Sequence, residues 1–324
     1  MILGIDIGGA NTKAASSDGK FTMSKYLPLW KEADLEGTLR SIKEAAGDID
    51  AVGVAITGEL ADCYPTKKEG IEHISSVVKK VFKNAVFYGS DGKFYRDTPD
   101  HKLFSAANWV ASARYVGMVH KDILFIDIGS TTTDIIPVVG SLPAAGMTDF
   151  QRLAHNELIY AGALRTNIAA LLQRVNIKDM DVRTSSELFA ITGDAYLLLE
   201  RITPEEYTCD TPDCGSKDSK GAALRLARVV CCDLEELDMG DVMDIARQVH
   251  TYQVDTLKEA VDELVKLHGL NKAIICGQGS FIAKDALLGM HIPFTMLSAE
   301  YGDEISKVFP AYAVARLLGN TVQD

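Results

Sequence analysis

The sequence has little of what a secreted, membrane-spanning or nucleic-acid-binding protein needs. Its 324 residues include only six cysteines, which are scattered too widely for a disulfide framework or a zinc site. No apolar run approaches the roughly 20 residues that span a membrane. Basic residues number 33 against 45 acidic ones, and the net charge of −12 argues against a general nucleic-acid or anionic membrane surface.

What remains is the composition of a globular protein in a reducing compartment. Hydrophobic residues make up 47% of the chain and charged residues 24%, which is ordinary for such proteins, and the length fits two domains. Met1 leads directly into an apolar run, so we expect no secretion signal. Together with the scattered cysteines, this predicts free thiols and a cytoplasmic location.

A motif of eleven residues occurs twice, 121 positions apart. Residues 3–13 read L-G-I-D-I-G-G-A-N-T-K, residues 124–134 read L-F-I-D-I-G-S-T-T-T-D, and six positions are identical. Each copy predicts a strand that ends in a carboxylate, a tight glycine turn and a second strand. Because a glycine turn exposes backbone N–H groups, it suits an anion such as phosphate. The two hairpins therefore predict a duplicated phosphate site.

The order of the other elements supports a duplication. Before the second hairpin, we predict strands over residues 2–7, 11–17, 21–27, 51–56 and 85–88 and helices over 33–46, 70–83 and 103–119. From that hairpin on, we predict strands over residues 123–128, 132–139, 273–276 and 294–297 and helices over 151–175, 219–232, 241–268 and from about 302. Capping boxes at Thr148, Thr184 and Thr203 mark helix starts, and Gly269 marks a helix end.

This pattern predicts where the domains begin and end. We expect a first domain over residues 1–120 and a second over 121–309, with a helical insertion over about 148–240. We expect the final helix, about 310–324, to pack back on the first domain. In such a duplication, a ligand binds between the halves, where each sheet presents its strand ends.

The segment Gly277-Gln278-Gly279-Ser280 follows a predicted strand and completes a wider pattern. With two Asp-centred hairpins and this later glycine-rich segment, the chain resembles the superfamily of actin, hexokinase and the heat-shock-chaperone ATPases. The resemblance covers the whole chain in order. It implies an α/β fold of two duplicated ribonuclease-H-like domains, with the helical insertion in the second.

A narrower resemblance is to the hydantoinase/oxoprolinase branch of that superfamily. Four strings are similar to those of its methanofuran-biosynthesis enzymes: T-G-E-L-A-D-C-Y (57–64), G-M-T-D-F-Q-R-L (146–153), E-L-I-Y-A-G-A-L-R-T (157–166) and E-E-Y-T-C-D-T-P-D (205–213). Relatives of that subgroup occur beside the one-carbon metabolism of methanogenesis. The resemblance implies a transferase that condenses an aminomethylfuran diphosphate with γ-glutamyltyramine, forms an aryl ether and releases pyrophosphate.

The two hairpins supply the first candidate site residues. Asp6 and Asp127 are our candidate catalytic carboxylates and ligands of a hydrated Mg²⁺. The candidate diphosphate-binding residues are the turn residues Gly8, Gly9, Asn11, Thr12, Lys13, Gly129, Ser130, Thr131, Thr132 and Thr133. The alternative is that each Asp-Ile-Gly only ends a strand.

A carboxylate must also remove the phenol proton of the acceptor, whose ordinary pKa is about 10. Glu59 and Asp62 follow the strand 51–56, and catalytic loops gather at such strand ends. The alternative for these two residues is a pair that caps a helix. Asp91 follows the strand 85–88 in the same way, as a candidate substrate-binding residue, and a plain turn is its alternative.

The remaining candidates are substrate-binding residues of the second half. Arg152 and Arg165, on the predicted helix from 151, are candidates to clamp the glutamyl carboxylates, with surface charge as the alternative. Gly277, Gly279 and Ser280 correspond to a segment that packs on adenosine in ATP-using relatives, and here are candidates to hold the furan or the amine. Helix packing alone also explains them.

Two other classes of function stay open on the sequence. One is an ATP-dependent small-molecule kinase, or a lactam or amide hydrolase, of the same superfamily. The other is a nucleotide-dependent sensor or assembly protein. For each enzyme hypothesis the expected partners are small molecules, with no nucleic acid and no membrane. The oligomeric state is open, a homodimer included.

Overall fold

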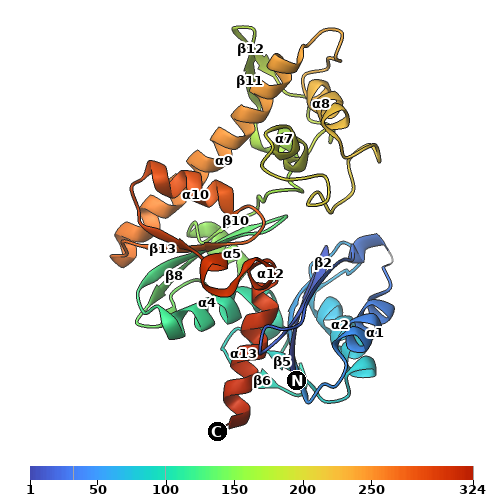
Figure 1. The fold of residues 1–324 in the computed structure, drawn as a ribbon, viewed down its shortest axis with the longest axis vertical. Helices are drawn as coiled ribbons and strands as arrows, with labels where there is room; N and C mark the ends of the chain where they lie inside the picture. Colours follow the sequence, from blue (N-terminus) through green and yellow to red (C-terminus); the bar gives the residue numbers. More distant parts are fainter. Residues whose placement is uncertain (32, 99, 324) are drawn as a thin grey trace. The chain divides into compact units, whose positions relative to one another are not determined.

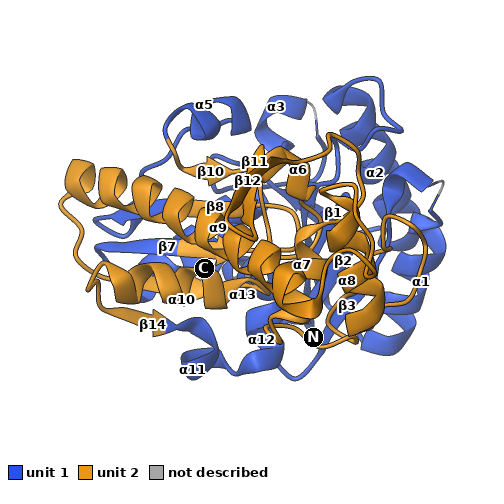
Figure 2. Ribbon diagram, turned by 90° about the horizontal axis from the view of Figure 1, so that it is seen from above, with its two compact units in different colours: residues 1–125, 136–155, 296–324 blue, residues 126–135, 156–295 orange. Residues whose placement is uncertain are grey.

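The computed structural model describes residues 1–31, 33–98 and 100–323 (Figure 1). The chain forms two compact units (Figure 2). Unit 1 contains residues 1–125, 136–155 and 296–324, and unit 2 contains residues 126–135 and 156–295. In the described part of the chain, no helix is long and apolar enough to cross a membrane.

A six-stranded sheet forms the centre of unit 1. Its strands are β1 (Ile2–Gly8), β2 (Asn11–Ser16), β3 (Thr22–Tyr26), β4 (Ala51–Thr57), β5 (Ala85–Tyr88) and β6 (Phe94–Tyr95). They lie in the order β3-β2-β1-β4-β5-β6. β1 pairs antiparallel with β2 and parallel with β4, as a hairpin followed by a helical crossover requires.

Helices cover both faces of this sheet. The helices of unit 1 are η1 (Leu29–Lys31), α1 (Leu35–Ala46), α2 (Lys67–Val81), α3 (His101–Phe104), α4 (Asn108–Val119), α5 (Asp149–Ala154), α11 (Leu297–Tyr301), α12 (Asp303–Lys307) and α13 (Phe309–Gln323). The apolar stripes of α1 and α2 pack with β1, β4 and β5 into one core. α13 packs against β1, β2 and β4 from the other side.

A second sheet repeats this arrangement. Its strands are β7 (Ile123–Ile128), β8 (Thr133–Val139), β9 (Leu142–Pro143), β10 (Leu158–Ile159), β13 (Ala273–Cys276) and β14 (Phe294–Met296). Their order is β10-β8-β7-β13-β14, and β9 also pairs with β8. Thus β8, β7 and β13 take the places that β2, β1 and β4 have in the first sheet. The shared order confirms the predicted α/β fold of two duplicated ribonuclease-H-like halves.

The elements of unit 2 beyond its sheet are α6 (Ile168–Leu171), β11 (Arg174–Ile177), β12 (Met180–Arg183), α7 (Thr192–Leu198), α8 (Ser219–Arg228), α9 (Met239–His268) and α10 (Ser280–Gly289). α9 begins with a capping box between Asp238 and Asp241 and ends at Gly269, whose φ of 66° is left-handed. This confirms the predicted long helix and its glycine end.

Part of the predicted insertion is wrong. The helix predicted over 151–175 ends at Ala154, Asn156 turns the chain with a φ of 57°, and β10, α6 and the start of the hairpin β11–β12 take the place of the rest. No helix starts at Thr184, and the one that follows begins at Thr192. At Thr203, both hydrogen bonds of a capping box form with Glu206, but they close only a turn. A capping box fixes local hydrogen bonds, and a helix also needs an apolar face to pack.

The two units are defined by which residues contact one another, whereas the expected domains are defined by the repeated motif. Residues 121–125, 136–155 and 296–309 belong to unit 1 by contacts and to the second half by the repeat. The boundary between the units runs through β7 and β8. The domain limits 1–120 and 121–309 therefore stay a prediction about the repeat.

Candidate functional site

The ends of β1 and β4 bring Asp6 and the loop after Thr57 together in unit 1. These strands pair in parallel, with Gly8 opposite Thr57, so their carboxyl ends lie at the same edge of the sheet. The Thr57 hydroxyl donates a hydrogen bond to Oδ1 of Asp6 at 3.0 Å. Asp6 is buried, and Glu59 follows two residues after Thr57. The carboxylate of the first hairpin thus lies against the loop that carries the candidate base.

Glu59 is 2% exposed, and Gly70 of α2 packs on its backbone. Burial raises the pKa of Glu59 to about 7, and the Asp149 carboxylate adds to the rise. Lys67 and the backbone amide of Ala106 act in the opposite direction without cancelling it. Among the described residues, Oε2 of Glu59 has no hydrogen-bond partner. Glu59 is therefore a buried carboxyl group that exchanges a proton near neutral pH.

The surroundings of Glu59 also decide between its alternatives. Thr66 caps α2 by accepting a hydrogen bond from the Glu69 amide, so the capping interpretation of Glu59 is wrong. Asp62 lies exposed in the same loop. Asp149 forms ion pairs with Arg152 at 2.8 Å and with Lys67 at 3.9 Å. The string 146–153 is the sequence signal for Asp149, although its only candidate from the sequence is Arg152.

The turn of the first hairpin presents its residues on two faces. Lys13 is the strand partner of Asp6, so these two side chains lie on the same face. Thr12, between Asn11 and Lys13, points to the opposite face and is fully buried. The candidate diphosphate residues of this hairpin are thus split between its two faces.

Asp91 closes the turn between β5 and β6. It accepts hydrogen bonds from the Tyr95 hydroxyl at 2.7 Å and from the Lys93 amide at 3.2 Å. These hydrogen bonds are the ones expected if Asp91 only closes a turn. Its role toward a substrate stays a prediction.

In unit 2, the turn between β7 and β8 is held by a distant segment of backbone. The Ala163 amide donates to the Gly129 carbonyl at 2.9 Å, and the Leu164 and Arg165 amides donate to the Ser130 carbonyl at 3.0 and 2.9 Å. The approach is so close that a Cβ on Gly162 would lie 2.6 Å from the Thr131 amide nitrogen. The string 157–166 therefore positions the second hairpin turn.

Arg165 places a cation beside the hydroxyl groups of this turn. Its Nη1 donates to Oγ1 of Thr131 at 3.1 Å, and Oγ of Ser130 lies 3.4 Å from the same oxygen. Thr133 differs, because its buried hydroxyl donates to the Ala161 carbonyl at 2.8 Å. A guanidinium with neighbouring hydroxyls and a glycine turn suits an oxyanion.

The two candidate arginines do not share a helix, so that prediction is wrong. Arg152 lies in the last turn of α5 in unit 1, where its buried guanidinium lies 4.7 Å from the Trp109 ring centroid and pairs with Asp149. Arg165 lies in a bend between β10 and α6 in unit 2. The role of either residue toward glutamyl carboxylates stays a prediction.

A buried ion pair supports the segment behind the second turn. The Thr192 hydroxyl at the start of α7 donates to the Gly162 carbonyl at 3.0 Å. Asp194, two residues on, pairs with Arg225 at 2.8 Å, and both side chains are 0% exposed. The pair also binds groups of the string 205–213, because the Tyr207 hydroxyl donates to Asp194 and Arg225 donates to Asp213.

The segment 277–280 packs against the end of β7. Gly277 has a φ of 86°, and a Cβ there would collide with the Asp127 carboxylate. The Gly279 amide donates to the Ile128 carbonyl at 2.8 Å, and Ser280 begins α10. The structure thus brings Gly277, Gly279 and Asp127 together.

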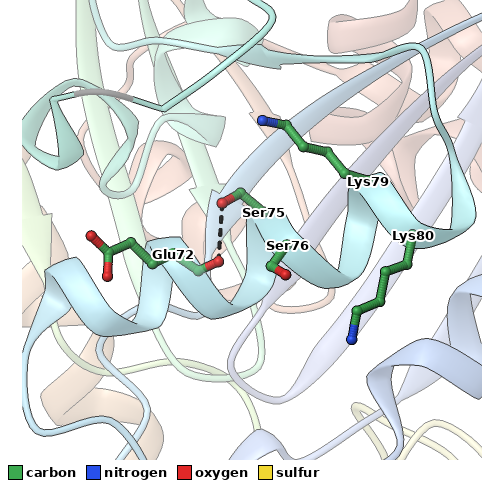
Figure 3. A pocket seen from close by; sticks show the side chains of 5 residues that line it. All are labelled: Glu72, Ser75, Ser76, Lys79 and Lys80. Atoms are coloured by element: carbon green, nitrogen blue, oxygen red, sulfur yellow. Dashed lines mark hydrogen bonds between the residues drawn. The ribbon is translucent and has the colours of Figure 1, made fainter.

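One surface hollow of unit 1 is lined by none of these residues. It has a volume of about 430 Å³ and is lined by Glu72, Ser75, Ser76, Lys79 and Lys80 (Figure 3). All five side chains come from α2, and Lys79 is paired with Asp97. A hollow on one helix cannot enclose a substrate, and none of its residues is a candidate from the sequence.

Comparison with known proteins identifies relatives over nearly the whole length. Residues 50–320 match the hydantoinase/oxoprolinase family. The (4-{4-[2-(gamma-L-glutamylamino)ethyl]phenoxymethyl}furan-2-yl)methanamine synthase of Methanocaldococcus jannaschii is 40% identical over 326 residues, which cover 98% of this chain and 97% of that protein. The synthase of the same name from Methanococcus vannielii is 38% identical over 206 residues, 62% of this chain and 93% of that protein.

Among solved structures, a ROK family glucokinase from Streptomyces griseus in complex with glucose and AMPPNP aligns with a TM-score of 0.49. Its sequence identity is 14%, over 97% of this chain and 98% of that chain. The repeated strand order, rather than this alignment, identifies the fold. By its sequence the chain belongs to the hydantoinase/oxoprolinase family and, within it, to the (4-{4-[2-(gamma-L-glutamylamino)ethyl]phenoxymethyl}furan-2-yl)methanamine synthases.

Proposed function

We propose that the protein joins an aminomethylfuran diphosphate to the phenol oxygen of γ-glutamyltyramine and releases pyrophosphate. The observation that carries the proposal is the 40% identity with the Methanocaldococcus jannaschii synthase, because it covers both hairpins and all four strings. The name of that relative describes an aryl ether between a tyramine phenol and the methylene carbon on C4 of the furan. The bond from this carbon to the diphosphate oxygen breaks, the bond to the phenol oxygen forms, and the phenol proton goes to a base.

Glu59 is the base that we propose. A phenol of ordinary pKa about 10 lies about three units above the pKa of about 7 that burial gives to Glu59. An exposed glutamate near its ordinary value of 4.5 would face a gap of about five and a half units. Burial also keeps water away from the carboxylate. Water there would otherwise compete with the phenol for the methylene carbon of the furan.

The turn 129–132 is the diphosphate cradle that we propose. Negative charge develops on the diphosphate as its bond to the methylene carbon of the furan breaks. Hydrogen-bond donors whose positions are fixed in advance stabilise this charge best. The hydroxyls of Ser130 and Thr131 and the guanidinium of Arg165 are such donors. Their positions are fixed by the backbone bonds from residues 163–165.

Mg²⁺ is the cofactor that we propose. In the described ranges, no three His, Cys, Asp or Glu side chains gather into a metal cage. Mg²⁺ suits sparser sites, because it keeps several waters and takes one or two carboxylates with phosphate oxygens. Asp6 and Asp127, each near the end of a hairpin strand, fit that donor set. A bound ion would add positive charge at the leaving diphosphate.

A coupled assay tests the function. The purified protein is incubated with the furan diphosphate, γ-glutamyltyramine and Mg²⁺, and mass spectrometry follows the ether and pyrophosphate. No ether from authentic substrates would overturn the proposal. A kinase or hydrolase would instead consume ATP, so a parallel reaction with ATP, followed by ADP release, separates the alternatives.

The metal assignment has its own test. Asp127→Asn should abolish turnover and weaken Mn²⁺ binding measured by electron paramagnetic resonance, while the circular dichroism spectrum stays unchanged. Unchanged Mn²⁺ binding would show that Asp127 is not a ligand.

A further inference from the structure

Unit 2 contains a second, smaller cavity directly behind the turn 129–132. Its volume is about 170 Å³. Ile128 and Thr133, the residues on either side of the turn, both line it. The other walls come from β10 and the residues after it, from α6, and from α9 and α10, which lie along this sheet (Figure 1). The cavity therefore lies wholly within one compact unit and shares its wall with the candidate diphosphate cradle.

The inner walls suit an uncharged group. Ile128, Leu257 and Ile282 are almost fully buried, and no lining side chain carries a formal charge. The two buried polar side chains are already hydrogen-bonded. Thr133 donates to the Ala161 carbonyl, and Gln253 accepts from the Tyr196 hydroxyl and donates to the Gly162 carbonyl. A charged ligand group would lose its hydration here without a partner of opposite sign.

Two aromatic rings border the cavity where it meets solvent. Tyr160 is 58% exposed and Tyr252 is 42% exposed, and both line the cavity. They come from distant parts of the chain, one from the segment after β10 and the other from α9. Aromatic side chains in such a position favour stacked or edge-to-face contacts with a planar ring.

The volume limits the ligand to a single ring. A cavity of about 150 Å³ in another protein holds one benzene molecule. The cavity of about 170 Å³ thus has room for one five- or six-membered ring with a short substituent. It is too small for the two linked rings of the proposed product.

We propose that this cavity binds one uncharged aromatic or heteroaromatic ring of a substrate. The inference rests on the proposed function, which supplies two such rings, the furan of the donor and the phenol of the acceptor. The Thr133–Ala161 hydrogen bond links the cavity wall to the segment that holds the turn, so a ring bound here also packs behind the diphosphate cradle.

A cavity-filling variant tests the binding. Thr256 is half-buried on α9 and lines the cavity, whereas Thr251 is exposed on the same helix and does not. Thr256→Met should fill the space, and Thr251→Met is the matched control. The probes are furfuryl alcohol and p-cresol, with cyclohexylmethanol as a non-planar comparison, in ligand-observed NMR titrations of the full-length protein.

The expected result is that at least one planar probe binds the native protein and the control. Thr256→Met should weaken that binding by about tenfold or more, because the methionine occupies the space of the ring. Leu171→Trp fills the cavity from α6 and should have the same effect, which guards against a local defect in α9. The inference is overturned if neither planar probe binds, or if both filling variants bind as the native protein does.

Steady-state kinetics identifies the ring. If the furan enters, Thr256→Met should raise KM for the furan diphosphate and leave KM for γ-glutamyltyramine unchanged, and the reverse holds for the phenol. Turnover with both KM values unchanged would overturn the substrate role of the cavity and leave the proposed function intact. Ring binding without any turnover would overturn the proposed function and leave the ring site intact.

Discussion

The two Asp-Ile-Gly hairpins have the same backbone plan and different surroundings. At the first, the Leu27 and Leu29 amides bind the carbonyls of Ala10 and Gly9, and the nearest loop carries the buried carboxyl group of Glu59. At the second, amides from residues 163–165 bind the turn carbonyls, and a guanidinium reaches the turn hydroxyls. The first hairpin thus lies beside a carboxyl group, and the second lies beside hydrogen-bond donors.

From this difference we propose that the duplicated fold separates its chemistry. The strand order is common to both sheets because it is set by the core, which tolerates little change. The loops that follow β4 and β10 are not constrained in that way, and they supply Glu59 and Arg165. In the proposed reaction, proton removal therefore belongs to the loop beside the first hairpin and the hydrogen-bond donors to the diphosphate belong to the second, while Asp6 and Asp127 are both proposed as Mg²⁺ ligands.

The largest expected effect is on proton removal. Glu59→Gln keeps the shape of the side chain and removes the base, so kcat should fall by about 10²–10⁴ with little change in the KM of the diphosphate. The measurement is pyrophosphate release under saturating substrates. Asp62→Asn, an exposed carboxyl group in the same loop, is the matched control and should retain activity within about twofold. The opposite pattern would transfer the role of base to Asp62.

The next effect concerns the support of the second hairpin. Asp194→Asn should lower the free energy of unfolding by about 3 kcal/mol, because the fully buried Arg225 would keep only the partly exposed Asp213 as a carboxylate partner. Asp181→Asn breaks an exposed pair with Arg174 in the same unit and should cost at most about 1 kcal/mol. Urea unfolding measures both values. Equal losses in the two variants would mean that the buried pair has no special role.

A third effect is the pH dependence that the burial of Glu59 causes. Its pKa is about 7 in the folded protein and near 4.5 in an unfolded chain, so between these values the folded state binds the proton more tightly. The stabilisation from Glu59 is complete below about pH 4.5 and is lost as the pH rises through about 7. The loss amounts to about 3 kcal/mol. Glu59→Gln should therefore match the native protein at pH 4.5 and exceed its stability at pH 8, in urea unfolding at each pH.

If the native protein gained stability relative to Glu59→Gln between pH 4.5 and 8, the raised pKa would be wrong. The separation of acid and donor chemistry between the hairpins would then lose its main support.

The sequence predicts the strands and the two hairpins well because their signals are local. Alternation, glycine turns and helix caps lie within a few residues, as at Gly269 after α9. The position of Arg165 is not predictable in this way. It depends on backbone bonds to Ser130, 35 positions earlier, and the sequence there was interpreted as a continuous helix. The burial of Glu59 likewise depends on contacts from Gly70 and Asp149.

The smallest expected effect compares the cations of the two hairpins. Arg165→Ala removes a donor beside the proposed diphosphate cradle, and kcat should fall roughly 10²-fold. Lys13→Ala removes the cation opposite Asp6, outside the turn 129–132 that we propose as the diphosphate cradle, and should cost on the order of tenfold or less. Arg165→Lys keeps the charge but loses the planar fork, so only part of the activity should return. Equal losses for Arg165→Ala and Lys13→Ala would mean that both hairpins hold the diphosphate, as the symmetry of the motif alone suggests.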